Sequence, residues 1–427
     1  MLSVSTIQYL ETLPRFAAKP GLERMQKILE FLGNPQQDLK YVHVTGTNGK
    51  GSTSATIESI LRHAGYKTGL FTSPHLFVYN ERIKVSAQDI ADDDFSKNLD
   101  RVKVVVERMV REDESMKPAL FEVLLAVAFL HFQQQKADVV ILEVGIGGLL
   151  DPTNVIDGLV TVITNVDLEH MEILGDTKEK IAEQKAGIIK KSAVVLTADQ
   201  DTRVIDIIVR TAREHDAQLF LLKPEDVHLT HQSLEGQVFD FGSYKALHIP
   251  FLGNYQMSNT ALAVLAAESL RKFGFQIDEQ AIRDGLRSVH WPLRLEMVHQ
   301  NPAILIDGAH NLHGVRTLHQ VLHDIFPERR KILVLGVSSD KPYREMARLL
   351  AEETSVVIVT QAQYRAARCE DLAESIADLK KEMYLTSDVK EALLKAKFLA
   401  KEDDLILVLG GLYLAAEARK AVDEIFS

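Results

Sequence analysis

The chain has 427 residues, of which 46% are hydrophobic and 26% charged, and its 49 basic and 60 acidic residues give a formal charge of −11. These values are typical of a globular protein with two or three domains, and the acidic balance argues against a protein that coats nucleic acid. One cysteine, Cys369, excludes an intramolecular disulfide. With no evident signal peptide and no apolar run of membrane-spanning length, we expect a cytoplasmic protein without a membrane partner.

The first part of the chain reads as strands alternating with helices. Unbroken apolar runs, expected for parallel strands covered on both faces, predict strands over 41–44, 67–72, 137–144 and 159–166. Helices are predicted after the first strand, over 121–133, over 177–189 and over 255–273. Asp176 with Glu179 resembles a capping box for the third helix, and Asn254 is the expected cap of the fourth. Short alternating segments over 227–249 predict antiparallel strands at the edge of this domain.

The pattern restarts around Trp291 and Pro292. Further apolar runs separated by helical segments predict four strands, over 303–306, 332–336, 355–360 and 405–409. They make a second doubly wound α/β unit of ordinary domain size. We therefore expect two α/β domains, residues 1–292 and residues 293–427.

The most informative motif is the glycine-rich turn from Thr45 to Ser52, which lies between the first strand and its helix. Such a turn directs backbone N–H groups and the helix dipole at one point, which suits a phosphate. Lys50 can reach the outer phosphates and Ser52 can face a bound magnesium ion. The spacing is not the usual G-x-x-x-x-G-K-[ST], and a glycine-rich turn alone could be only a tight loop. The strand before the turn, the lysine, the serine hydroxyl and the helix after the turn together favour nucleotide binding.

Polar residues follow several predicted strands, where ligands collect in open α/β sheets. Glu143 closes one strand, and Asp167 and His170 follow the next. Glu143 stands where a nucleotide-bound Mg²⁺ needs an oxygen ligand, although a solvated strand-end carboxylate is the plain alternative. His170 alone would more often be an ordinary surface or core histidine. In the second domain, Asp307 and His310 follow a strand in the same way.

Lys185 is ambiguous by pattern, because most helical lysines are solvated. It lies among apolar and small residues in the segment 183–189, where burial would lower its pKa. A neutral lysine beside a metal ion could form a carbamate with CO₂ and so become an anionic ligand.

Motifs along nearly the whole chain resemble the folylpolyglutamate synthases, including the bifunctional dihydrofolate synthases, within the Mur ligase superfamily. In chain order these motifs are TGTNGKGS at 45–52, TSPHL at 72–76, NERI at 80–83, EVGIGG at 143–148, DPTNV at 151–155, the segment 167–190, Gln256 and Asn259, WPLRLE at 291–296, DGAHN at 307–311, and LYL at 412–414. The resemblance implies an N-terminal P-loop-type ATPase domain with a parallel sheet and a C-terminal Rossmann-like domain, with ATP between them.

The resemblance also implies roles for individual residues. ATP would be held by seven residues, namely Gly49, Lys50, Gly51, Ser52, Asn259, Arg294 and Asp307. Magnesium, as two ions, would be bound by Ser73, Glu143 and His170, with Lys185 carbamylated. Arg82 would face the folate, and His310 and Tyr413 would lie near the incoming glutamate. Lys50, Lys185 and His310 are the expected catalytic residues.

The chain departs from the family pattern at three positions. Leu293 replaces a small residue, Leu312 replaces a proline, and Gly411 replaces a serine. Either Arg365 or Arg368 could match the family arginine of the glutamate region. These changes concern the glutamate site more than the ATP site.

The implied reaction joins L-glutamate to a folate or dihydropteroate carboxylate through an acyl phosphate, in an enzyme expected to be a monomer. A cell-wall Mur ligase would carry a separate domain for its UDP-sugar before the phosphate loop, and a loop beginning by residue 45 leaves no room for one. A GTPase or kinase-like switch would need the standard loop spacing. A catalytically idle ATP-binding regulator would not require Glu143, His170 and Lys185 together.

Overall fold

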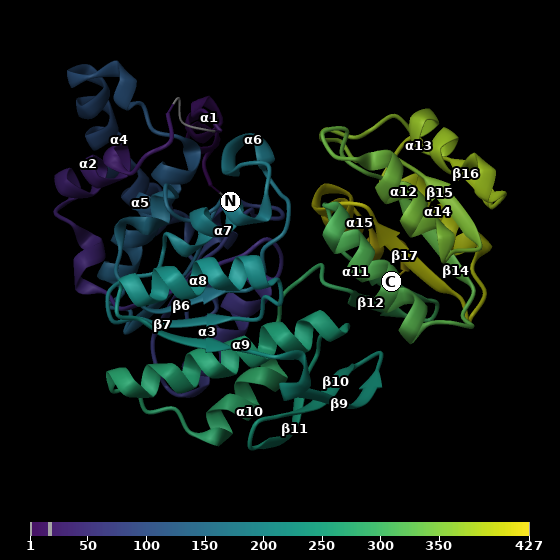
Figure 1. Ribbon diagram of the computed structural model, residues 1–427. Helices are drawn as coiled ribbons and strands as arrows, with labels where there is room; N and C mark the ends of the chain where they lie inside the picture. The colour runs from purple at the N-terminus through teal and green to yellow at the C-terminus, as the bar shows by residue number, and fades with distance from the viewer. Residues whose placement is uncertain (1, 16–18, 427) are drawn as a thin grey trace. The chain divides into compact units, whose positions relative to one another are not determined.

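The computed structural model describes residues 2–15 and 19–426. By contacts between residues the chain divides into two units (Figure 1). The N-terminal unit comprises residues 1–228, 239–249 and 257–289, and the C-terminal unit comprises residues 229–238, 250–256 and 290–427. Among the described residues, none of the helices has the length and apolar character needed to cross a membrane.

The N-terminal unit is built on an eight-stranded sheet in the order β4-β3-β2-β5-β1-β6-β7-β8. Six strands are parallel, and β3 and β4 pair antiparallel at one edge. The strand bounds are β1 Tyr41–Thr45, β2 Thr68–Phe71, β3 Ile83–Val85, β4 Gln88–Asp89, β5 Val139–Glu143, β6 Gly158–Ile163, β7 Val194–Thr197 and β8 Gln218–Leu221. The four predicted strands of this part of the chain are confirmed, with ends that differ from the predicted ones by up to three residues.

Helices cover this sheet. Their bounds are α1 Val4–Thr12, α2 Glu23–Leu32, α3 Lys50–His63, α4 Asp92–Glu112, α5 Leu120–Gln134, α6 Met171–Leu174, α7 Lys178–Ala186, α8 Thr202–Glu214, α9 Asn254–Leu270 and α10 Glu279–Ser288. α3 packs on β1, β2 and β5, and α10 packs on α3. There a Cβ on Gly285 would lie 2.5 Å from the Cα of Ile60, so the close approach requires glycine. α5 is a buried helix that is apolar on nearly all sides, as predicted, and its residues Glu122 to Phe132 are buried.

The predicted cap of α7 is wrong in detail. Thr177, not Asp176, is the N-cap, and its side chain accepts a hydrogen bond from the Lys180 N–H. The helix also ends at Ala186, three residues before the predicted end. Asp176 instead forms an exposed ion pair with Lys180. The segment 227–249 does form strands, but in a separate three-stranded sheet of β9 Val227–Ser233, β10 Gly236–Phe241 and β11 Tyr244–Ile249.

The C-terminal unit contains a six-stranded sheet in the order β12-β13-β17-β14-β15-β16. Its strands are β12 Glu296–Gln300, β13 Ala303–Ile306, β14 Lys331–Leu335, β15 Val356–Val359, β16 Glu382–Leu385 and β17 Leu405–Leu409. Its helices are α11 Leu312–Ile325, α12 Tyr343–Glu352, α13 Cys369–Ile376, α14 Val389–Leu399 and α15 Leu412–Phe426. The four predicted strands are confirmed. The sequence missed the antiparallel edge strand β12 and the parallel edge strand β16.

Candidate nucleotide and metal site

The glycine-rich turn joins β1 to α3, as predicted. Gly49 is the N-cap of α3 in a left-handed conformation with φ 82°, and Lys50, Gly51 and Ser52 form its first turn. Gly51 and Ser52 are buried. The Lys50 Nζ donates to the carbonyl oxygens of Gly46 at 2.7 Å and Thr47 at 3.1 Å. The ammonium group is thus held directly over the turn, where it can pair with a phosphate.

The end of β6 holds the turn in place. Asn165 Oδ1 accepts from the Asn48 N–H at 2.9 Å, and Thr164 Oγ1 donates to the Asn48 carbonyl at 2.6 Å. A Cβ on Gly46, whose φ is 149°, would lie 1.8 Å from Thr164 Oγ1. Gly46 is therefore required for the turn to pack against Thr164.

Asn259, on α9, lies beside the same turn. It is 9% exposed, and a Cβ on Gly49 would lie 2.5 Å from its Oδ1 atom. The structure thus places Asn259 beside Gly49, although the two residues lie far apart in the chain.

Two of the three predicted metal ligands are adjacent. Glu143 is the last residue of β5, is 4% exposed, and its Oε2 accepts from the Ser73 N–H at 2.8 Å. Oxygen donors of this kind are those that Mg²⁺ prefers, so the pair fits such an ion. His170 is exposed at the start of α6, with φ 45°. Among residues 2–15 and 19–426, no three His, Cys, Asp or Glu side chains gather as a metal-binding group, and the predicted set relies on Ser73 as its third member.

Lys185 is buried on α7, with 1% of its side chain exposed. Its Nζ donates to Glu169 Oε1 at 2.8 Å. Burial lowers the pKa of Lys185 to about 8, although Glu169 opposes this shift. Burial would raise the pKa of Glu169, but Lys50 and Lys185 outweigh burial and hold that pKa below its usual value. Lys185, Glu169 and Lys50 therefore form one electrostatic cluster.

Glu169 is the main residue that the sequence analysis missed. It stands directly before His170, and its position just beyond a strand end was the available signal. Only the fold shows that it pairs with a lysine 16 residues further on.

Arg82 lies in a short 3-10 helix, η2 Tyr79–Arg82, and donates to His75 Nδ1 at 2.9 Å. Burial and the Arg82 charge lower the pKa of His75 to about 4. His75 is therefore neutral near pH 7 and can accept this hydrogen bond, which orients the guanidinium group.

In the C-terminal unit, Asp307 follows β13 and is 3% exposed. Its carboxylate accepts from the N–H groups of Leu295 at 2.9 Å and Ala309 at 2.7 Å. Burial raises its pKa, and the nearby Arg294 opposes that shift. The Arg294 Nη1 donates to the Leu293 carbonyl at 2.8 Å and would lie 2.9 Å from a Cβ on Gly308. Arg294 and Asp307 thus belong to one local cluster.

His310 and Tyr413 are both exposed. His310 Nδ1 lies 3.1 Å from the Gly308 carbonyl, and the Tyr413 ring packs on Tyr364 with centroids 4.7 Å apart. Arg365 lies over Tyr364, 5.2 Å from its ring centroid, whereas Arg368 lies beside Glu370. Arg365 therefore contacts the same ring as Tyr413 does.

Comparison with known proteins agrees with this geometry. Residues 44–267 match the Mur ligase middle domain, and residues 293–412 match the Mur ligase glutamate ligase domain. The chain is 36% identical to the dihydrofolate synthase/folylpolyglutamate synthase of Bacillus subtilis, over 95% of this chain and 96% of that protein. It is 35% identical to the folylpolyglutamate synthase of Lacticaseibacillus casei, over 98% of each.

Solved structures of the same group superpose on nearly the whole chain. The Mycobacterium tuberculosis folylpolyglutamate synthase complexed with ADP has a TM-score of 0.89 and 29% identity, covering 98% of this chain and 97% of that one. An Escherichia coli protein in complex with DHPP and ADP has a TM-score of 0.87 and 30% identity, covering 99% and 98%. The chain belongs to the folylpolyglutamate synthase/dihydrofolate synthase family of Mur ligases.

The three departures from the family pattern have different structural contexts. Leu293 is fully buried with φ 59°, a conformation that favours a smaller residue. Leu312 is the first residue of α11, where proline is common, and the helix is still capped because Asn311 accepts from the Gly314 N–H. A Cβ on Gly411 would meet no atom within 4 Å, so this glycine is not required by packing.

Proposed function

We propose that this protein uses ATP to add L-glutamate to the γ-carboxylate of a folate or folylpolyglutamate, releasing ADP and phosphate. We further propose that it can join glutamate to dihydropteroate, as a dihydrofolate synthase does. The observation that carries the proposal is the ordered turn with Lys50 held over it. Full-length similarity to synthases of these names supports the choice of substrates.

ATP would be bound by two sets of residues. Gly49, Lys50, Gly51 and Ser52 hold the triphosphate by backbone N–H groups, ammonium and hydroxyl. Asn259, Arg294 and Asp307 complete the binding of the nucleotide. The known structures of relatives with ADP or an ATP analogue support nucleotide binding by this fold.

Magnesium would be held by Ser73, Glu143 and His170, and a second ion would be supported by carbamylated Lys185. When bound, the metal supplies positive charge that offsets the negative charge on the phosphates. Carbamate formation requires that the Lys185 ammonium lose one proton, that the neutral nitrogen attack the carbon of CO₂, and that the nitrogen then release a second proton to solvent. The burial and the lowered pKa of Lys185 support this step. Because Glu169 now pairs with the ammonium group, the pair must separate when the carbamate forms.

The reaction has two steps. A carboxylate oxygen of the folate attacks the γ-phosphorus of ATP, ADP leaves, and an acyl phosphate forms. The amine of L-glutamate then attacks the acyl carbon, losing a proton as phosphate leaves. Lys50 offsets the charge that accumulates on the transferring phosphoryl group. Arg82 would orient the folate, and His310 and Tyr413 would orient glutamate.

The test is an assay of the purified full chain with ATP, Mg²⁺ and labelled L-glutamate, with dihydropteroate and tetrahydrofolate supplied in parallel. We expect ADP release and label transfer to at least one acceptor, and the acceptor used identifies the activity. ADP release without label transfer to either acceptor would refute the proposal. Nucleotide binding without any turnover would also refute it and would favour an idle ATP-binding regulator. Turnover only with a UDP-sugar would indicate a cell-wall Mur ligase. We also propose that the enzyme is a cytoplasmic monomer, which sedimentation and fractionation would check.

A further inference from the structure

Several carboxylates follow the ends of the neighbouring parallel strands β6 and β7. Three of them pair with a lysine or an arginine, namely Asp167, Glu169 and Asp201. Asp199 is used differently. It lies two residues beyond β7, is 7% exposed, and its carboxylate accepts hydrogen bonds from main-chain N–H groups. A buried carboxylate that binds main-chain N–H groups fixes the path of the chain to which they belong.

The two oxygens of Asp199 hold two different segments. Its Oδ2 accepts from the Val166 N–H, beyond β6, at 2.6 Å, and its Oδ1 accepts from the Asp201 N–H, before α8, at 2.9 Å. The Asp199 N–H donates to Thr197 Oγ1 at 3.2 Å, which orients the residue. Val166 is 3% exposed. Loss of the carboxylate would therefore take this acceptor from the N–H group of a nearly buried residue, which is costly.

The segment that starts at Val166 leads to His170, the candidate metal ligand. Its second residue, Asp167, is tied to the glycine-rich turn. The Asp167 N–H donates to Thr47 Oγ1 at 2.9 Å, and the same hydroxyl donates to the Asp167 carbonyl oxygen at 3.1 Å. Asp199 thus fixes the first residue of the segment and Thr47 fixes the second. The path of the chain toward His170 depends on both anchors.

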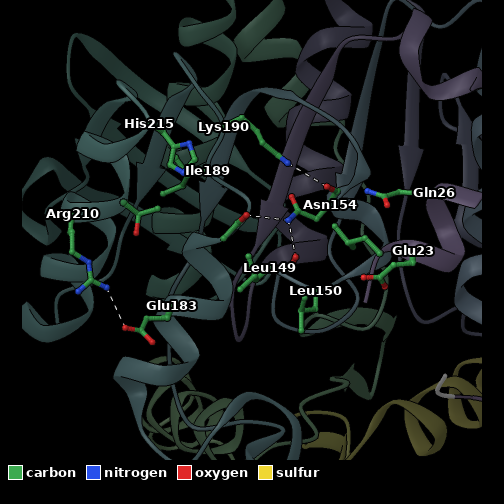
Figure 2. Close-up of a pocket in the computed structure, with 13 residues that line it drawn as sticks. Glu23, Gln26, Leu149, Leu150, Asn154, Glu183, Ile189, Lys190, Arg210 and His215 are labelled. Carbon is green, nitrogen blue, oxygen red and sulfur yellow. Dashed lines mark hydrogen bonds and ion pairs between the residues drawn. The ribbon is translucent and has the colours of Figure 1, made fainter. Parts of the chain in front are cut away.

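Other parts of the site have anchors of their own. The helix α7, which carries Lys185, packs on α8 through a shared apolar core, and Arg210 pairs with Glu183 across the two helices at 3.2 Å. Figure 2 shows this pair beside the cavity that the two helices help to line. The glycine-rich turn is held by the end of β6. Loss of Asp199 should therefore displace the segment 166–170 while Lys185 and the turn stay in place.

We propose that Asp199 is a positioning residue that fixes the segment 166–170 and thereby sets the affinity of the site for a divalent cation. It acts through the main chain at Val166 and not as a ligand. Groups that orient metal ligands in this way affect the affinity for the metal, although they do not touch it. The inference rests on the metal-binding role proposed for His170.

The variant Asp199→Asn tests the proposal. It keeps the size of the side chain but offers one acceptor oxygen in place of two, because the amide nitrogen is a donor. Mn²⁺, as a probe for Mg²⁺, is titrated by electron paramagnetic resonance into the full chain saturated with a non-hydrolysable ATP analogue. We expect about tenfold weaker Mn²⁺ binding than in the wild type. Binding of ADP without a divalent cation should change by less than about twofold, since the turn keeps its anchors.

Two further variants separate positioning from a general loss of stability. Thr197→Val removes the hydroxyl that orients Asp199 and should weaken Mn²⁺ binding about threefold. Asp404→Asn is the matched control, because Asp404 is 4% exposed and accepts from the Lys401 N–H at 2.8 Å in the C-terminal unit. It should lower the thermal stability but leave the Mn²⁺ affinity unchanged. Equal losses of Mn²⁺ affinity in Asp404→Asn and Asp199→Asn would overturn the proposal.

The results also separate this inference from the proposed function. Wild-type Mn²⁺ affinity in the Asp199→Asn protein, together with glutamate addition by the wild type, would overturn the inference alone. Absence of Mn²⁺ binding by the wild type would overturn both the metal assignment and the inference. The glutamate-addition assay then decides whether the enzymatic function stands without them.

Discussion

The candidate residues of the two units are held in different ways. In the N-terminal unit, Lys50 and Lys185 are fixed by hydrogen bonds of 2.7 and 2.8 Å, and Lys185 is buried. In the C-terminal unit, His310 and Tyr413 are exposed, and Tyr413 packs on one neighbouring ring. Groups that bind a phosphate work best when they are already oriented, whereas exposed side chains at loop ends can adjust to a small acceptor. Substitutions of the fixed residues in the N-terminal unit should therefore have larger effects than substitutions of the exposed residues in the C-terminal unit.

The largest effect is expected at the phosphate loop. Lys50→Ala should lower kcat by about 10³-fold, the upper end for the loss of one group that stabilises developing charge. Phosphate release at saturating substrates measures it. Lys97→Ala, at an exposed position on α4, is the control and should retain activity. A Lys50→Ala enzyme with normal glutamate addition would remove Lys50 from the mechanism.

Lys185→Arg should keep the positive charge but lower activity about 100-fold, as expected when support of a metal site is lost. A guanidinium group cannot form the carbamate. Nuclear magnetic resonance with ¹³C-bicarbonate should show a carbamate signal in the wild type that is absent from this variant. Lys180→Arg, on the same helix but 60% exposed, is the control. An active Lys185→Arg enzyme would exclude carbamate chemistry.

Two glycine-to-alanine substitutions, one in each unit, allow a direct comparison of the two units. Gly46→Ala should lower the free energy of unfolding by about 1–3 kcal/mol and weaken ADP binding, because the new Cβ would overlap Thr164. Gly411→Ala should change stability by less than about 0.5 kcal/mol, since its Cβ meets no atom within 4 Å. Thermal unfolding and ADP titration measure both. Equal effects would show that the two regions are equally adaptable.

A buried histidine on β1, the strand that leads into the glycine-rich turn, should make stability depend on pH. His43 on β1 is fully buried; burial, and then Lys190, lowers its pKa from 6.5 to about 3. Between pH 6.5 and 3 the His43 imidazole is protonated in the unfolded chain but not in the folded chain. Stability should therefore fall as pH falls through that window, by up to about 1.4 kcal/mol per pH unit.

The variant His43→Gln should make this slope shallower by the same amount. Urea unfolding at pH 4.5, 5.5 and 6.5 measures the slope, and His215→Gln, at an exposed position, is the control. An unchanged slope in His43→Gln would show that another group causes the acid sensitivity.

The smallest effect is expected at Tyr413. Tyr413→Ala should raise the KM for L-glutamate about fivefold with little change in kcat, because an aromatic contact contributes roughly 1 kcal/mol. Initial rates at varied glutamate measure it. Phe398→Ala, at an 82% exposed ring, is the control. A large fall in kcat would mean that this exposed site is as strictly ordered as the phosphate loop.

The local pattern of the sequence was sufficient for most strands that are buried on both faces, because their apolar runs have no other stable environment. It missed β7, although all four of its residues are buried. It was not sufficient for the edge strands β12 and β16, whose residues are partly exposed and lack such runs. The predicted N-cap of α7 was one residue too early. Asp176 and Thr177 are both suitable caps, and only the path of the backbone selects between them.

The glycine-rich turn between β1 and α3 could be predicted because its residues are adjacent in the chain. The partners of that loop could not be predicted from residue types alone. Thr164, Asn165 and Glu169 act through contacts with residues far from them in sequence. Parallel strand order brings the end of β6 beside the end of β1. The sequence alone thus determined the glycine-rich turn and its place between a strand and a helix, because these residues are neighbours in the chain. The tertiary structure decided which side chains hold the turn, such as Thr164 and Asn165, because those distances depend on strand pairing.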